Sequence, residues 1–157
     1  MNGYAYLMSQ TALDTLLKSK YTTISKDFIH ALADAHVLSG IAMNFAGSSR
    51  PVSGSEHMFS RALDYHCETE NLHGIQVALG TVAILKLIGR EYKEILDYLH
   101  MFEIDINPQR LGIPCETFVK CMQAAPNMRK DRFTTLHTAN LGDTRLRSLY
   151  DELVTEL

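Results

Sequence analysis

Two histidines are the residues of this sequence whose type and spacing best suit chemistry. His57 ends a turn-rich segment, Gly47-Ser-Ser-Arg-Pro-Val-Ser-Gly-Ser-Glu-His57, and His73 begins the segment His73-Gly-Ile-Gln-Val77. They are 16 residues apart, which is too far for ligands on neighbouring turns of one helix. The spacing suits two antiparallel helices joined by a short turn, with one histidine on each. Two imidazoles facing each other across such a pair would form half of a metal site.

A second interpretation of the two histidines stays open, because a histidine at a helix start is often a cap or a surface group. The other histidines have no partner at ligand spacing beside a supporting loop, and we interpret them as ordinary residues. They are His30, His36, His66, His100 and His137. Of these, His66 falls on the same expected hairpin as His57 and His73.

The segment before His57 also carries polar groups that could hold a substrate. Arg50 could bind an anionic group with its planar guanidinium, or it could be a surface arginine beside Pro51. Ser49, Ser53 and Ser55 (with the neighbouring Ser48) could donate hydrogen bonds to a substrate oxygen. The same serines could equally form turns and caps.

The elements that would position these groups are predicted to be helical throughout. Apolar residues recur at helical spacing, and Ser25, Ser55 and Asp143 are placed to cap helices. Helices are expected at about 4–18, from Ser25 to Gly47, and at 56–66, 73–88, 91–102, 116–124 and 143–157. No convincing strand and no glycine-rich phosphate-binding motif is found, which argues against a nucleotide-binding sheet. The predicted fold class is an all-α helical bundle.

Two of these helices have few polar residues. From Val37 to Ala46 the polar residues thin out to Ser39 and Asn44, which predicts that this helix enters the protein interior. The helix from His73 to about Ile88 is apolar on most faces, which predicts a central, buried helix.

Composition excludes several classes of protein. A length of 157 residues predicts one domain, and the formal net charge of −3 gives no basic footprint for nucleic acid. Cys67, Cys115 and Cys121 have no CxxC spacing, so we expect reduced thiols in a cytoplasmic protein. We expect no membrane span and no secretion signal.

The motifs around the histidines closely resemble a known family. Residues 39–57, which run Ser-Gly-Ile-Ala-Met-Asn-Phe-Ala-Gly-Ser-Ser-Arg-Pro-Val-Ser-Gly-Ser-Glu-His, and then His73-Gly-Ile-Gln-Val77 resemble the metal-binding helical domain of glycerol-1-phosphate dehydrogenases. Lys130-Asp-Arg-Phe-Thr-Thr-Leu136 resembles the family's segment before its last helices. This family belongs with the glycerol dehydrogenases, iron-containing alcohol dehydrogenases and dehydroquinate synthases. The resemblance covers nearly the whole chain in the right order.

The resemblance implies a fold and a chemistry. Family members bind NAD(P) in an N-terminal Rossmann-like domain and zinc in a C-terminal, dehydroquinate synthase-like helical domain. An aspartate and two histidines hold the metal, which acts on the substrate as a Lewis acid. The two histidines map onto His57 and His73, and the loop with Ser49, Arg50, Ser53 and Ser55 would lie beside the substrate.

The sequence departs from the family in two ways. It lacks the nucleotide domain, and it begins after the segment in which the family places its aspartate ligand. Asp14 and Asp34 are candidates for that ligand only by residue type. We therefore expect an incomplete zinc site, and NAD(P) binding only where a partner supplies the nucleotide domain.

Two hypotheses about function follow. The chain is either the metal-binding half of a zinc- and NAD(P)-dependent polyol-phosphate dehydrogenase, or a non-catalytic helical interaction or metal-binding module derived from that family. The expected partner is a second copy of the chain or a separate chain with the nucleotide domain, and no nucleic acid. An exposed apolar patch is expected around 39–46 and 73–77, with self-association to cover it.

Overall fold

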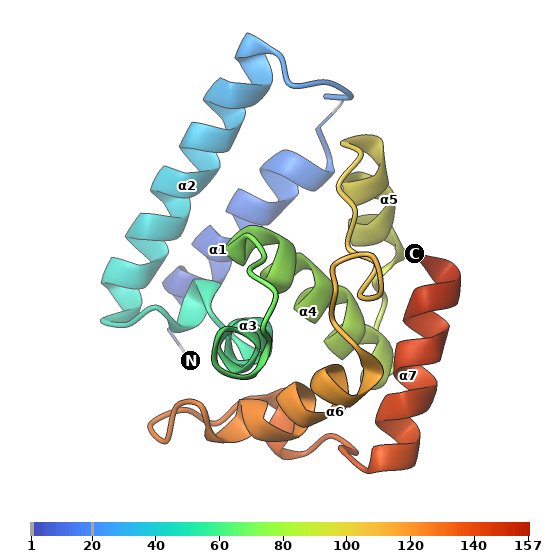
Figure 1. The fold of residues 1–157 in the computed structure, drawn as a ribbon. Coiled ribbons are helices and arrows are strands. Elements are labelled where there is room, and N and C mark those ends of the chain that lie inside the picture. The colour runs from blue at the N-terminus through green and yellow to red at the C-terminus, as the bar shows by residue number, and fades with distance from the viewer. Residues whose placement is uncertain (1, 20) are drawn as a thin grey trace. The chain divides into compact units, whose positions relative to one another are not determined.

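The computed structural model describes residues 2–19 and 21–157, and within these ranges it contains helices and no strands (Figure 1). The predicted all-α fold class is therefore confirmed. The α-helices are α1 (Gly3–Leu17), α2 (Lys26–Ala46), α3 (Ser55–His66), α4 (His73–Leu87), α5 (Lys93–Met101), α6 (Cys115–Ala124) and α7 (Asp143–Glu156). Short 3-10 turns occur at η1 (Arg50–Val52), η2 (Ala125–Asn127) and η3 (Thr135–His137). Among the described residues, none of the helices has the length and apolar character needed to cross a bilayer.

The chain folds into two compact units. The pair unit runs up to Gly54 and includes Asp97–Glu103, so it contains α1, α2 and the second half of α5. The bundle unit consists of Ser55–Leu96 and Ile104–Leu157, and it contains α3, α4, α6 and α7.

The helices of the pair unit begin and end at residues suited to those positions. The side chain of Asn2 caps α1 by accepting hydrogen bonds from the backbone N–H groups of Tyr4 and Ala5. Ser25 caps α2 by accepting from the N–H of Phe28 at 3.1 Å. Gly47 ends α2 with a φ of 60°, a left-handed conformation that glycine adopts without steric cost. The predicted boundaries at Ser25 and Gly47 are confirmed.

The prediction that Val37–Ala46 enters the interior is wrong. Val37, Ile41 and Phe45 are exposed by 61%, 38% and 50%. In the pair unit α2 packs along α1, and Ala35 and Ala42 are buried while Val37, Ile41 and Phe45 stay outside. A helix with one packing partner buries one face, and these two alanines, seven residues apart, share that face. Ile41 and Phe45 give the exposed apolar surface expected within residues 39–46, whereas Ile75 and Val77 of the expected 73–77 segment are only partly exposed.

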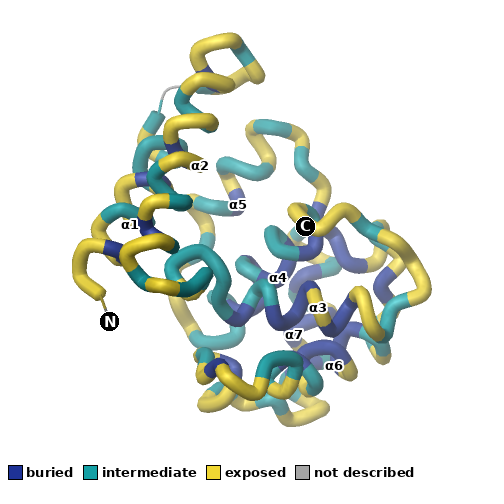
Figure 2. The backbone as a smooth tube through the Cα atoms, turned by 90° about the vertical axis from the view of Figure 1, so that its left-hand side faces the viewer, coloured by how far each residue is buried: buried dark blue, intermediate teal, exposed yellow. Residues whose placement is uncertain are grey.

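The bundle unit has the larger core. Figure 2 shows the buried segments along α3, α4, α6 and α7 in dark blue. The core side chains of these helices are Met58, Phe59, Ala62, Leu63, Leu79, Val82, Ala83, Ile84, Phe118, Val119, Cys121, Met122, Leu146, Leu149, Tyr150 and Leu153. The prediction that α4 is a buried helix is confirmed, since Leu79, Val82 and Ala83 have no exposed surface.

Several helix starts differ from the predicted positions by one or two residues, and Ser55, predicted to cap α3, is instead its first residue. Gly142, and not Asp143, occupies the N-cap position of α7, so the Asp143 carboxylate lies in the first turn, where the helix dipole favours it. Helix α5 begins at Lys93 because the Glu91 carboxylate accepts hydrogen bonds from the N–H groups of Tyr92 and Lys93.

Candidate metal centre

The two predicted histidines meet across the α3–α4 hairpin. His57 lies in the first turn of α3, and His73 is the first residue of α4. Their ring centroids are 5.2 Å apart and the ring planes are inclined by 59°. Both residues belong to the bundle unit, so the structure brings them together as the sequence spacing predicted.

A close approach of the two helices fixes this hairpin. A Cβ atom added to Gly80 of α4 would lie 3.2 Å from the carbonyl oxygen of Glu56 on α3. Only glycine allows α4 to pack this near the backbone that carries His57. At the other end of the hairpin, Thr69 and Asn71 donate hydrogen bonds to the carbonyls of Gly112 and Leu111. The hairpin is therefore held at both ends.

Each histidine ring has a partner at its Nδ1 atom. His57 Nδ1 lies 2.8 Å from Glu56 Oε1. An ionised carboxylate only accepts hydrogen bonds, so His57 Nδ1 carries the proton of this contact. His73 Nδ1 lies 2.9 Å from the hydroxyl of Ser60, which is fully buried. Partners of this kind orient histidines that bind metals through the other ring nitrogen.

The geometry of the pair fits a shared metal ion. Two imidazoles that bind one tetrahedral zinc at about 2.1 Å have ring centroids about 5 Å apart, and the observed separation is 5.2 Å. His57 keeps 26% of its side chain exposed, so an ion could reach the ring from solvent. Among the described residues, no set of three histidine, cysteine or acidic side chains is placed to hold a metal. The centroid separation is therefore compatible with a shared zinc ion, and the two rings supply fewer than the three protein ligands of a catalytic site.

Comparison with known proteins finds relatives that share one name. The glycerol-1-phosphate dehydrogenase [NAD(P)+] of Staphylothermus marinus is 44% identical over 118 residues, 74% of this chain. The enzymes of the same name from Hyperthermus butylicus and Methanosarcina acetivorans are 36% and 40% identical over 116 and 120 residues. The chain is homologous to the glycerol-1-phosphate dehydrogenases. It spans about a third of the length of these relatives, 33% in each case. No family model matches the chain.

These relatives test the resemblance that was based on residues 39–57 and 73–77. The resemblance of this chain to the helical part of a glycerol-1-phosphate dehydrogenase is confirmed, and the all-helical structure agrees with it. The roles of individual residues in metal or substrate binding stay predictions.

The predicted substrate-binding residues fall into both units. Ser49, Arg50 and Ser53 lie in the pair unit, at the start, first residue and end of η1. Ser55 opens α3 in the bundle unit, is 6% exposed, and has its hydroxyl 2.7 Å from that of Thr135. This contact ties α3 to η3 and shows the structural role that a serine at this position can have.

The remaining histidines have local surroundings. His30, His36 and His100 are exposed. His66 packs edge-on against the ring of Tyr65, and His137 accepts a hydrogen bond from the N–H of Thr134 at the start of η3. His66 thus makes its described ring contact with the adjacent residue of its own helix.

The two aspartates considered as ligands lie in the pair unit. Asp14 forms an ion pair of 2.7 Å with Lys18, and the hydrogen bond from that lysine holds the pKa of Asp14 below its usual value. Asp34 is exposed on α2. Neither the ion pair of Asp14 nor the exposed position of Asp34 indicates that it is the missing metal ligand.

The cysteines carry free thiols, as predicted. Cys121 is buried in α6, and burial raises its pKa to about 12. A thiol must lose its proton to bind a metal or attack a substrate, so Cys121 is an inert core residue.

Three polar residues near the histidines were missed by sequence reasoning. Ser60 contacts His73 and also Gln76, and Gln76 in turn contacts Asp64. A signal for two of them was present: Ser60 follows His57 by three residues, and Gln76 follows His73 by three residues. Such a spacing places a polar group on the same helix face as each histidine, next to residues that are otherwise apolar.

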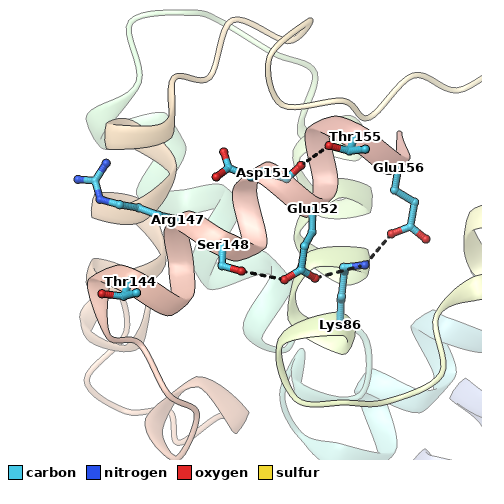
Figure 3. Close-up of a pocket in the computed structure, with 8 residues that line it drawn as sticks. All are labelled: Lys86, Thr144, Arg147, Ser148, Asp151, Glu152, Thr155 and Glu156. Atoms are coloured by element: carbon cyan, nitrogen blue, oxygen red, sulfur yellow. Dashed lines mark hydrogen bonds and ion pairs between the residues drawn. The ribbon is translucent and has the colours of Figure 1, made fainter.

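A separate groove runs along α7 and has a structural explanation (Figure 3). Lys86 of α4 reaches the carboxylate of Glu156 at 2.7 Å and that of Glu152 at 3.5 Å. The hydrogen bond to Glu156 raises the pKa of Lys86, which therefore stays charged. These contacts fasten α4 to α7 and involve neither histidine.

Proposed function

We propose that this chain is the metal-binding helical part of a zinc- and NAD(P)-dependent polyol-phosphate dehydrogenase whose substrate is glycerol 1-phosphate. In this proposal His57 and His73 bind the zinc. The observation that carries it is the facing imidazole pair, 5.2 Å between centroids, in a chain homologous to glycerol-1-phosphate dehydrogenases.

The residues of the chain have distinct tasks in this proposal. His57 and His73 each present one ring nitrogen, Glu56 and Ser60 hold the rings at the opposite nitrogen, and Gly80 lets the two helices approach. Bound zinc would supply Lewis-acid polarisation of the substrate's hydroxyl or carbonyl oxygen. The third ligand is then a carboxylate from outside the described residues, or water.

The loop before α3 is proposed to recognise the phosphate end of the substrate. The guanidinium of Arg50 can pair with two oxygens of a phosphate, which a lysine ammonium cannot match in geometry. Ser49 and Ser53, which lie in the same unit as Arg50, carry hydroxyl groups that can donate to the remaining oxygens. Ser55, predicted with them, is buried and engaged with Thr135.

NAD(P) and the third metal ligand are proposed to come with a nucleotide-binding partner. In this proposal a separate chain carries the nucleotide domain, and α2 offers a surface for association with that chain or with a second copy of this one. Exposed apolar residues of α2, among them Ile41 and Phe45, support an association of this kind.

Zinc titration by calorimetry on the metal-stripped protein tests the proposal. We expect the wild-type protein to bind one zinc ion per chain, and His57→Ala and His73→Ala each to weaken binding more than about tenfold. His36→Ala, which removes an exposed histidine of α2, is the matched control and should bind as the wild type does.

The outcome decides between the two functions considered for this chain. Binding that is lost in both variants and kept in the control supports the metal-binding half of a dehydrogenase. A wild-type protein that binds no zinc would refute that role and favour a non-catalytic helical module.

A further inference from the structure

His73, Ser60, Gln76 and Asp64 are linked by a series of hydrogen bonds in which each proton has one possible position. The series begins at Asp64 of α3, whose Oδ1 atom lies 2.9 Å from the amide nitrogen of Gln76. A carboxylate only accepts, so the Gln76 amide must turn its NH₂ group toward Asp64. Its carbonyl oxygen therefore points the other way, toward Ser60.

Ser60 has a single proton to donate. Its hydroxyl lies 2.6 Å from Gln76 Oε1, and an amide oxygen only accepts, so the Ser60 proton points at Gln76. Ser60 is fully buried and Gln76 is 2% exposed, so solvent does not compete for this bond. The contact of 2.9 Å between Ser60 Oγ and His73 Nδ1 must then use the proton of the imidazole.

This proton count determines the tautomer of the neutral His73 ring. With the proton on Nδ1, the lone pair is on Nε2, and only a nitrogen with a lone pair can bind a metal. His57 reaches the same state more directly, because its Nδ1 atom faces the Glu56 carboxylate at 2.8 Å. Both rings thus offer Nε2.

We propose that Asp64, Gln76 and Ser60 are positioning residues that hold His73 in its Nδ1–H tautomer and so make Nε2 the metal-binding atom. The choice of Nε2 as ligand rests on the proposed function, while the tautomer itself does not. Asp64 determines which group donates and which accepts in each of these hydrogen bonds. Without it the Gln76 amide could turn over, Ser60 could donate to His73 Nδ1, and the proton of the ring would move to Nε2.

The tautomer can be observed directly in the metal-free protein. Nitrogen-15 NMR of the imidazole side chains distinguishes protonated from unprotonated ring nitrogens, and His73→Asn identifies the signals of His73. We expect the wild-type signal of Nε2 to be that of an unprotonated nitrogen at a pH where the ring is neutral. In Gln76→Leu, where Ser60 loses its acceptor, we expect the His73 proton to move to Nε2.

A matched pair of variants separates positioning from simple loss of structure. Gln76→Glu keeps an oxygen acceptor for Ser60, and a proton shared with the Asp64 carboxylate replaces the lost amide hydrogen bond, so the wild-type tautomer should be kept. Gln123→Leu removes a glutamine of α6 that donates to Leu141 O, without contact to either histidine, and should leave His73 unchanged. In a parallel zinc titration Gln76→Leu should lower the affinity 10–100-fold, the usual effect of removing a partner of a metal-binding histidine.

The failure of each proposal has its own signature. A wild-type His73 protonated on Nε2, or an unchanged tautomer in Gln76→Leu, overturns the positioning role. The expected tautomers in a protein that binds no zinc would support the positioning role and refute the metal site.

Discussion

Gly80 of α4 offers the sharpest test of how the histidine hairpin is packed. A Cβ atom at this position would lie 3.0 Å from Phe59 Cδ1, 3.2 Å from the Glu56 carbonyl oxygen and 3.3 Å from Glu56 Cα. Two of these three atoms belong to the backbone of α3, which cannot rotate away. Phe59 has no exposed surface and is enclosed by the core, so its ring has little room to move. Gly80→Ala must therefore push α3 and α4 apart by a few tenths of an ångström.

Two effects of opposite sign decide the stability of this variant. Alanine is favoured over glycine inside a helix by about 1 kcal/mol. Adding a methylene-sized group to a close-packed contact costs about 1–3 kcal/mol. The contact cost exceeds the helix gain at Gly80, so we expect the free energy of unfolding to fall by about 1 kcal/mol. Gly40 in α2 has no atom within 4 Å of an added Cβ, so Gly40→Ala should gain stability.

Urea unfolding followed by circular dichroism measures both variants. Gly74→Ala is a second control, because Gly74 lies in α4 and also has nothing within 4 Å of an added Cβ. We expect a lower midpoint for Gly80→Ala than for the wild type, and no loss for either control. A Gly80→Ala protein as stable as the Gly74→Ala protein would refute the close approach of α3 and α4. The same variant should bind zinc more weakly, because Glu56 and His57 move away from His73.

Two further predictions concern the charged clamp and the exposed surface. The hydrogen bond from Lys86 holds the pKa of Glu156 below 4.5, and a carboxylate with a lowered pKa contributes stability that is lost as the pH falls below the unfolded value. Thermal unfolding between pH 5 and about pH 3 should therefore show a steeper loss of stability for the wild type than for Lys86→Met. Lys120→Met, which removes an exposed lysine of α6, is the control and should behave as the wild type. Equal slopes for all three proteins would contradict a stabilising contact between Lys86 and Glu156. Tyr4 and Phe45 form a ring pair 6.1 Å apart that is largely exposed. Light scattering should therefore detect association of the wild type at high concentration, and less association of Phe45→Glu. A wild-type protein that stays monomeric would contradict the proposed self-association.

The helices of this protein could be predicted from the sequence because their signals are local. The caps at Ser25 and Gly47 and the apolar run of α4 act on neighbouring residues in the chain, so their effect does not depend on distant contacts. The same locality explains the small errors. At α5 the predicted first residue, Glu91, accepts hydrogen bonds with its side chain and the helix begins two residues later. At α7 Gly142, and not Asp143, occupies the N-cap position.

The histidine pair was found from spacing and from the resemblance to a family, and its facing geometry was confirmed. The spacing predicted one histidine on each helix of the hairpin, and the packing of α3 against α4 brings the two rings to 5.2 Å.

Only the tertiary structure could decide which surfaces are covered and which polar groups meet. The sequence predicted that the apolar residues around Ile41 are buried, yet they are exposed. An apolar pattern alone does not determine how many other helices pack against a helix. The contacts among Ser60, Gln76 and Asp64 depend on the rotation of α3 and α4 about their axes. That rotation is set by side-chain packing across the hairpin, including the approach at Gly80, and not by the residues of either helix alone.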